Sequence, residues 1–568
     1  MRGFPLRARL AGPVALLVPL LGAGLAALSV AAVWHFALAL RVVAPFSDMF
    51  REYRRYADRD LLPYLIFPDN EHRPVLPRLV FIADHHLADS LGLITLPVSL
   101  LCLLAVPAVI FLAVRRGLGW KAALLAASAL AAALFWLGHH PNLIWPKQLH
   151  MHMALLLAVL AAWAGARERW ALAALAGLAA SFSFGYGLVV FPMLVIGVLL
   201  TRAGGGQRMP PPGIALAIVL GIGALTVLLY LATFQAGGGA GIQRGIGGPV
   251  GIGGILASLL DPLAVARYFL TLKAVPLDFL LGSLGLKLPS LVPMVLAAAG
   301  IILFAAGTLA ALLSRRPVPP EQRMALLLGW FCIGTALMTA LARAGLDEPG
   351  QAASARYQQV SLLWWFALAL WAALRWPVLR AGLAALALAA ILVFPLSSRA
   401  LMPGVAAEYL QLRLPVAAIL SGVPEERTLA LLRSNPRARA EGLAVVARRG
   451  WALHALPQAG WPGRRLEDIG LSRADGECVS ASLDAAPAEG LADGWVLRGA
   501  IAGGGWLYWI VLADGDGVVR GLGVPLGLQG PDGIAWQGFV PGAVLPDGLT
   551  VHAVERGLIR DRLLPPCR

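Results

Sequence analysis

The sequence predicts a polytopic α-helical membrane protein with a soluble C-terminal α+β domain, and three observations lead to this fold class. Hydrophobic residues make up 59% of the 568 residues, and charged residues only 14%. Apolar runs recur before about residue 398, each near the roughly 20 residues that a helix needs to cross a bilayer. From 399 onward the sequence becomes mixed and polar. We therefore predict a membrane domain over 1–398 and a soluble domain over 399–568.

The apolar runs predict eleven membrane helices. The first is too long for the core of a signal peptide and lacks a convincing small-residue cleavage site, so we expect it to be retained. The stretch 170–201 is compatible with one long helix, but the polar and glycine residues at 181–187 favour a break between two short ones. The predicted spans are 12–38, 91–114, 120–137, 151–166, 170–184, 187–201, 213–233, 291–313, 324–342, 359–375 and 381–397.

Basic residues in the short turns between these runs set the expected orientation. Positive residues favour the cytoplasmic side of a membrane. With Arg2, Arg7 and Arg9 held inside, eleven crossings place every basic turn inside and the C-terminus outside. We expect the bacterial inner membrane, with the C-terminal domain in the periplasm. The turns also account for most of the net charge of +15, so the expected partner is the lipid bilayer and not nucleic acid.

The first predicted outer loop, 41–90, is dense in ionisable groups. A bilayer tolerates such groups only where they face water or a partner, so the loop is the first place to look for a functional site. Two amphipathic stretches within it predict helices lying along the membrane surface. The ionisable residues are Asp48, Asp58, Asp60, Asp69, Glu71, His72, Arg73, Asp84, His85 and His86.

Three further outer loops are predicted. The second, 138–150, is short and contains Lys147 and His150; the fourth, 343–359, contains Arg343, Arg356 and Tyr357. The third, 234–290, begins with a glycine-rich stretch over 237–254 that is typical of a mobile loop and continues as an amphipathic segment.

The C-terminal domain is expected to contain helices over 404–450 and then short strands. Alternating segments between 475 and 560 are separated by Asp-Gly pairs, which is typical of a small antiparallel β-sandwich. Cys478 and Cys567 bracket these strands, and on an oxidising side of the membrane we expect a disulfide between them. Cys102 and Cys332 fall inside apolar runs as packing residues, and no zinc-ligand spacing is present.

The architecture resembles the GT-C superfamily of integral-membrane glycosyltransferases: a long first outer loop with surface helices, an Asp soon after the first span, and an outer C-terminal domain. Local strings that resemble bacterial membrane proteins of this type are 70–73 (Asn-Glu-His-Arg), 181–185, 343–345 and 355–357. The resemblance implies an enzyme that transfers a sugar from a polyprenyl-phosphate donor to an envelope glycan or lipid acceptor on the outer face. The family often has two adjacent acidic residues, whereas Asp48 is followed by Met49. No cofactor is therefore assigned, and a divalent metal stays possible.

This chemistry suggests a role for each candidate residue. Asp48 is the expected catalytic base, because a general base must take the proton of the acceptor hydroxyl, and Glu71 is expected to support it. Expected substrate-binding residues are Asn70, His72, Arg73, Lys147, His150, Arg343, Arg356 and Tyr357. Each has a structural alternative: a loop or helix-capping Asp, a salt bridge, or an interfacial Arg. A lipid or polysaccharide transporter and a non-catalytic envelope-glycan assembly protein remain rival functions, although spans nearly free of ionisable residues disfavour the transporter.

Overall fold

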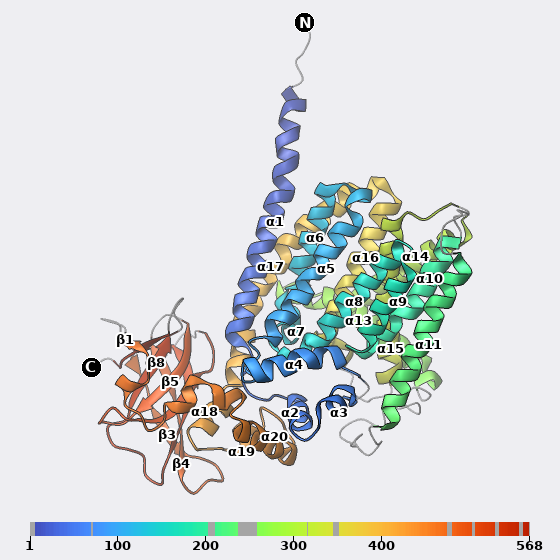
Figure 1. The fold of residues 1–568 in the computed structure, drawn as a ribbon. Coiled ribbons are helices and arrows are strands. Elements are labelled where there is room, and N and C mark those ends of the chain that lie inside the picture. The colour runs from blue at the N-terminus through green and yellow to red at the C-terminus, as the bar shows by residue number, and fades with distance from the viewer. Residues whose placement is uncertain are drawn as a thin grey trace.

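The computed structural model describes residues 6–69, 72–202, 211–236, 258–314, 316–344, 351–473, 480–502, 506–528, 533–555 and 561–566. A large helical bundle carries a β-rich C-terminal domain at one end (Figure 1). Seven of the described helices are long and apolar enough to cross a membrane, or eight if the bent pair Trp120–Leu134 and Leu137–Ile144 forms one span. The chain is thus a multi-pass membrane protein by the length and composition of its helices.

All eleven predicted segments are helical, but four of them fall short of a span by themselves. The second half of 170–201 is a separate helix, as predicted, and the break contains the short helix η3 (Gly185–Val189). A Cβ at Gly187 would lie 2.2 Å from the carbonyl carbon of Ala180, so the break accepts only glycine there. The eleven helices are α1 (Leu6–Leu40), α5 (Thr95–Leu118), α6 (Trp120–Leu134), α8 (Leu149–Ala166), α9 (Trp170–Ser181), α10 (Val190–Arg202), α11 (Pro212–Ala236), α14 (Leu291–Leu313), α15 (Pro320–Arg343), α16 (Gln358–Arg375) and α17 (Arg380–Gln411).

Several basic turns meet at one end of the bundle. Arg323, near the start of α15, donates to Glu168 in the α8–α9 turn at 3.0 Å. A Cβ at Gly117, at the end of α5, would lie 3.1 Å from the side chain of Glu321. The C-terminal domain lies at the other end of the bundle (Figure 1). This separation agrees with the expected sorting of basic turns to one side of the membrane.

The first loop forms three helices at the same end as the C-terminal domain (Figure 1): α2 (Met49–Ala57), α3 (Leu61–Ile66) and α4 (Val75–Leu87). Leu61, Leu62 and Leu79 on α3 and α4 are exposed. Apolar residues exposed next to a set of membrane helices fit the predicted location along the bilayer surface.

The amphipathic segment of the third loop is more deeply buried than the sequence suggested. It forms α13 (Pro262–Ser283), which packs against α14, α15 and α16. Ser361 of α16 donates to the carbonyl of Leu272 at 2.6 Å, and Trp365 donates to the carbonyl of Lys273 at 2.9 Å. The glycine-rich stretch 237–254 lies outside the described residues.

The C-terminal domain begins with α18 (Leu414–Leu420), α19 (Glu426–Leu429) and α20 (Pro436–Arg449) and continues as one sheet of nine described strands. The strand path is β1-β9-β8-β5-β6-β7-β4-β2, with β3 paired to β4, and every pair is antiparallel except β1 with β9. The strands are β1 (Ser472–Arg473), β2 (Ser480–Ala481), β3 (Asp484–Pro487), β4 (Gly494–Ala502), β5 (Leu507–Ala513), β6 (Val519–Pro525), β7 (Ile534–Pro541), β8 (Thr550–Glu555) and β9 (Arg562–Leu564).

The predicted β-sandwich is therefore wrong in its layering, because the described strands form a single sheet. Register shifts lie in β5 between Leu512 and Ala513 and between Leu507 and Trp509. Bulges of this kind increase twist and bend a sheet. Side chains of the sheet, including Leu512 and Trp536, form a core of their own. The helix α18 packs against strands β6 and β7. Cys478 and Cys567 lie outside the described residues, so their disulfide stays a prediction.

Candidate functional site

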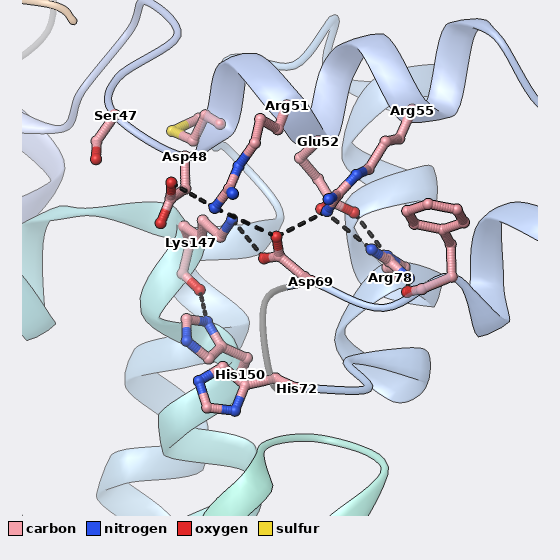
Figure 2. Close-up of polar contacts among 12 residues, drawn as sticks. Ser47, Asp48, Arg51, Glu52, Arg55, Asp69, His72, Arg78, Lys147 and His150 are labelled. Carbon is pink, nitrogen blue, oxygen red and sulfur yellow. Dashed lines mark hydrogen bonds and ion pairs between the residues drawn. The ribbon is translucent and has the colours of Figure 1, made fainter. Parts of the chain in front are cut away.

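The candidate site is built on one face of α2. Arg55 follows Arg51 by four residues and Glu52 by three, so it lies beside each of them on the helix, and Arg51 lies three residues after Asp48 at the N-terminus. Side chains from elsewhere in the chain join this face in Figure 2. We call the whole group the α2 charge cluster; its members are Asp48, Arg51, Glu52, Arg55, Asp69, Arg78 and Lys147.

Asp69 is the centre of the α2 charge cluster. Its carboxylate lies 2.8 Å from the Lys147 ammonium, 2.7 Å from Arg55 and 3.6 Å from Arg51. The side chains of Asp69 and Lys147 are each only 7% exposed. Burial alone would raise the pKa of Asp69, but Lys147, and then Arg55 and Arg51, outweigh it and hold the pKa well below its usual range. Asp69 therefore stays ionised and joins the first loop to the start of α8.

A second buried ion pair, between Arg78 and Glu52, also holds α2. Arg78 of α4 donates to both oxygens of Glu52, at 2.7 and 3.3 Å, and also to the carbonyl of Tyr64 at 2.8 Å. Burial acts to raise the pKa of Glu52, and the adjacent Arg78 lowers it below the usual value. The guanidinium of Arg78 thus connects α2, α3 and α4 as one unit.

Asp48 differs from the two buried carboxylates. Its side chain is 36% exposed, and it lies 2.6 Å from Arg51 (Figure 2). It stands at the N-cap position of α2 but accepts no capping hydrogen bond from the described helix backbone. The structural alternative for this residue, a loop or helix-capping Asp, stays open. Asp48 is the carboxylate of the cluster most open to solvent, while Arg51 fixes its position.

His72, Arg73 and His150 lie beside the cluster and contact neighbouring helices. The ring of His72 lies 3.8 Å from that of Phe184 and 6.4 Å from that of His150, and it accepts from the Gly185 amide at 3.3 Å. His150 Nδ1 contacts the carbonyl oxygen of Lys147 (Figure 2). The Arg73 guanidinium lies over the Tyr230 ring at 4.8 Å. His72 thus joins the first loop to the break after α9, and Arg73 joins it to α11. Asn70 and Glu71 lie outside the described residues, so the role expected of each stays a prediction.

Arg343 and Arg356 form a second basic group, which we call the arginine pair. Their guanidinium carbons lie 6.0 and 5.2 Å from the centre of the Tyr357 ring. The hydroxyl of Tyr268 on α13 is buried nearby without a hydrogen-bond partner among the described residues, and so is Nε of Arg356. The structure thus brings the three predicted residues of the fourth loop together.

The arginine pair and the α2 charge cluster are connected through the loop 138–150. Asn142, in α7 (His140–Ile144), donates to the carbonyl of Arg356 at 2.9 Å. The chain continues through η2 (Pro146–Gln148), which carries Lys147 into the cluster. No hydrogen bond or ion pair among the described side chains joins Asp48 directly to Arg356.

Sequence reasoning missed several residues that build this site. Asp69, Arg51, Glu52, Arg55 and Arg78 were either unnoticed or counted only as loop charges. The spacing of Arg51, Glu52 and Arg55 on a short helix was the available signal. The partners of Asp69 and Glu52 come from distant positions, and spacing alone does not predict such contacts.

Asp84 and His85 of α4 line a small pocket behind α2, together with Glu52 and Lys147. The Asp84 carboxylate accepts from the amides of Gly92 at 2.9 Å and Ile94 at 2.7 Å, so it shapes the turn into α5. Burial raises the pKa of Asp84. Within the described ranges, no group of three His, Cys, Asp or Glu side chains is placed to hold a metal ion.

A scan against protein-family models found no match, and searches of curated proteins and of solved structures found no similar protein. The function is therefore argued from the site itself. Its geometry offers a solvent-accessible carboxylate fixed by an arginine, a buried ionic centre that holds the surrounding helices, and a separate pair of arginines.

Proposed function

We propose that this protein is a membrane glycosyltransferase of the GT-C type. It would transfer a sugar from a polyprenyl-phosphate donor to a hydroxyl of an envelope glycan or lipid on the outer face of the bacterial inner membrane. One observation carries the proposal. Asp48 is an accessible carboxylate held 2.6 Å from Arg51 on a braced helix, at the end of a bundle of apolar helices.

The reaction has two chemical requirements. A base must remove the proton of the acceptor hydroxyl as its oxygen attacks the sugar, and cationic groups must stabilise the departing phosphate. Asp48 suits the first requirement because its side chain is 36% exposed, whereas Asp69 and Glu52 are buried within their ion pairs. A base must also be held within hydrogen-bond reach of its substrate, and the bracing of α2 supports this.

The arginine pair suits the second requirement. Arginine binds phosphate oxygens through two parallel hydrogen bonds. Nε of Arg356 and the hydroxyl of Tyr268 are buried donors without described partners, which a bound phosphate would satisfy. The exposed leucines of α3 and α4 support access from the bilayer, because a lipid-linked donor must approach from that side.

The remaining features of the proposal concern the membrane. All eleven helices would cross it, with the basic turns in the cytoplasm and the C-terminal domain in the periplasm. The meeting of basic turns at the end opposite the C-terminal domain supports this topology. Reporter fusions after residue 400 that are active only in the cytoplasm would contradict it.

The catalytic proposal is tested with Asp48→Asn, which keeps the shape of the side chain and removes the base. Sugar transfer from a polyprenyl-phosphate donor in proteoliposomes should fall by about 10²-fold or more, because general-base catalysis commonly contributes that much. The control is Asp58→Asn at the exposed C-terminus of the same helix, which should leave the rate unchanged. An Asp48→Asn protein that transfers sugar at the wild-type rate would remove Asp48 from the mechanism.

Donor binding is tested with Arg356→Ala. Affinity for a polyprenyl-phosphate vesicle probe should fall about tenfold, since a hydrogen bond to a charged group contributes about 1.5–3 kcal/mol. The matched control is Arg375→Ala. Arg375 is the exposed last residue of α16, at the end of the helix away from Arg356. Equal binding by the two variants would contradict the phosphate assignment and leave the transporter and assembly functions as the better explanations.

A further inference from the structure

The C-terminal domain contacts the residue that immediately precedes Asp48. The Ser47 amide donates to the carbonyl of Leu432 at 3.0 Å, and Arg433 donates to the carbonyl of Ser47 at 2.7 Å. Ser47 has a φ of 50°, a left-handed conformation that is uncommon for a residue other than glycine. Strained backbone of this kind persists only where its surroundings hold it. Here both hydrogen bonds that hold it come from the C-terminal domain.

The same domain receives the apolar face of α2. Phe50 is only 1% exposed and packs over Gly442 of α20. A Cβ at Gly442 would lie 2.4 Å from Cδ1 of Phe50 and 3.2 Å from its Cβ, so any side chain there would displace the ring. The absence of a side chain at position 442 is what allows α2 to lie against α20.

A third contact holds the end of α4. The rings of His85 and Trp451 stack with centres 5.0 Å apart and planes 12° from parallel. Next to them, the amide of Ala452 donates to the carbonyl of Asp89 at 2.7 Å. The C-terminal domain thus contacts the first loop at the start of α2, along α2 and after α4.

A helix as short as α2, with nine residues, is not stable by itself in water. One of its faces belongs to the α2 charge cluster and the other to the contact with α20. The position of Asp48 and Arg51 therefore depends on both halves of the chain.

We infer that the C-terminal domain is a positioning element of the candidate site, which holds α2 through Ser47 and through Phe50 on Gly442. The contact itself is independent of any reaction. Its consequence for catalysis rests on the proposed function. The domain would then not be a separate binding module appended to the bundle, because the orientation of the base would depend on it.

The geometry is tested in the full chain with the pair Phe50→Cys and Gly442→Cys. A Cβ at Gly442 would lie 3.2 Å from the Phe50 Cβ, slightly below the roughly 3.5–4.5 Å found in disulfides. Mild oxidation should cross-link this pair. The control pair, Phe50→Cys with Ala440→Cys, uses an exposed residue of the same helix and should stay reduced. Failure of the first pair to cross-link, or equal cross-linking of both, would overturn the inference.

The positioning role is tested by Gly442→Leu against Ala440→Leu. The reporter is the thiol introduced by Asp48→Cys, whose rate of reaction with maleimide is measured. Adding Gly442→Leu should change this rate several-fold. Adding Phe50→Ala as well should restore the original rate, because the smaller side chain makes room for the leucine. Ala440→Leu should leave it unchanged. In variants that retain Asp48, Gly442→Leu should lower sugar transfer about tenfold or more, because small misplacements of a catalytic group are costly.

The two proposals fail in different ways. Unchanged labelling in Gly442→Leu overturns the positioning role whatever the enzyme activity. Changed labelling that Phe50→Ala reverses supports it, even if the wild-type protein transfers no sugar, and that absence of transfer would refute the proposed function alone. Cross-linking of the Phe50→Cys/Gly442→Cys pair that abolishes transfer until the bond is reduced would show that α2 must leave α20, which would also overturn the inference.

Discussion

Replacing Asp69 with Asn is the sharpest test of the electrostatics of the α2 charge cluster. The substitution keeps the size of the side chain but removes the charge that faces three cations. Lys147 is the cation most affected, because its side chain is 7% exposed and its ammonium lies 2.8 Å from the carboxylate. Without Asp69, a buried ammonium would lose its ionic partner.

The expected loss of stability in Asp69→Asn depends on how exposed each cationic partner is. Removing one member of a buried ion pair typically destabilises a protein by about 3–5 kcal/mol. Arg55 and Arg51 are more exposed, at 13% and 24%, and Arg51 keeps Asp48 at 2.6 Å. They can therefore be stabilised by water or by a second carboxylate. We expect a loss of about 3 kcal/mol, most of it from Lys147.

The assay is denaturant-induced unfolding of the purified protein in detergent, monitored by a label on the first loop. The double variant Asp69→Asn/Lys147→Met should be more stable than Asp69→Asn, because it removes the unpaired ammonium. The control is Glu489→Gln, whose partner Arg427 is 81% exposed, and an exposed pair contributes about 0–1 kcal/mol. Asp69→Asn and Glu489→Gln variants of equal stability would refute the reasoning.

The dependence on pH provides a second check. The folded-state pKa of Asp69 is depressed, so its stabilising contribution is present above the ordinary carboxyl value and disappears as pH falls through the depressed one. The stability difference between the wild type and Asp69→Asn should therefore persist at pH 5. It should decrease only below about pH 4, near the unfolded-state value. A difference that disappeared between pH 7 and 5 would contradict the assignment.

Two further predictions concern other parts of the chain. Burial lowers the pKa of His85 to about 4. The contribution of neutral His85 to stability is therefore present above pH ~6.5 and declines as the pH falls toward ~4. His85→Gln should weaken the dependence of the melting temperature on pH over this range, and His86→Gln, at the exposed neighbouring residue, should not. A Cβ at Gly329 would lie 2.1 Å from the Phe304 ring, whereas Gly382 has open space around it. Gly329→Ala should therefore destabilise the bundle by about 1–3 kcal/mol in thermal unfolding, and Gly382→Ala should not; equal effects would contradict this packing.

The eleven apolar helices of the membrane domain could be predicted from the sequence, because the length of an apolar run is a local property. Each predicted segment became a helix, and the glycine at 187 marks a break that a side chain would prevent. Whether a helix crosses the membrane is a further question. Short helices such as α9, with 12 residues, are apolar but are not long enough to cross a membrane by themselves. The predicted number of eleven crossings therefore goes beyond the seven or eight candidate spans.

Other features depended on contacts between distant residues. Alternating strands with Asp-Gly turns fit one curved sheet as well as two packed sheets, and only the pairing between distant strands, such as β5 with β8 and β4 with β7, joins the described strands into one sheet. The sequence singled out Asp48 because it follows the first apolar helix. It gave no reason to place Asp69 at the centre, because its partner Lys147 is 78 residues away. Long-range ion pairs have no fixed spacing from which to be predicted.

The distribution of buried polar groups bears on the choice between an enzyme and a transporter. His152 lies between Ser99 at 2.8 Å and Gln359 at 3.1 Å, and all three residues are within the first turns of α8, α5 and α16. They form a polar layer near the end of the bundle that carries the first loop. Deeper in the bundle, Lys273 donates to the carbonyl of Cys332 at 2.8 Å and lies 5.7 Å from the Trp364 ring.

A relay for ions or protons requires a series of ionisable groups that face one another across the membrane. Lys273 is instead satisfied by a carbonyl and an aromatic face, and no carboxylate is described as its partner. The buried carboxylates Asp69 and Glu52, with their cations, lie instead around α2, where the C-terminal domain also makes contact. This arrangement favours chemistry at the membrane surface over passage through the bundle. Lys273→Met should therefore leave sugar transfer by the folded protein near the wild-type rate, and a loss as large as that expected for Asp48→Asn would argue for a route through the bundle.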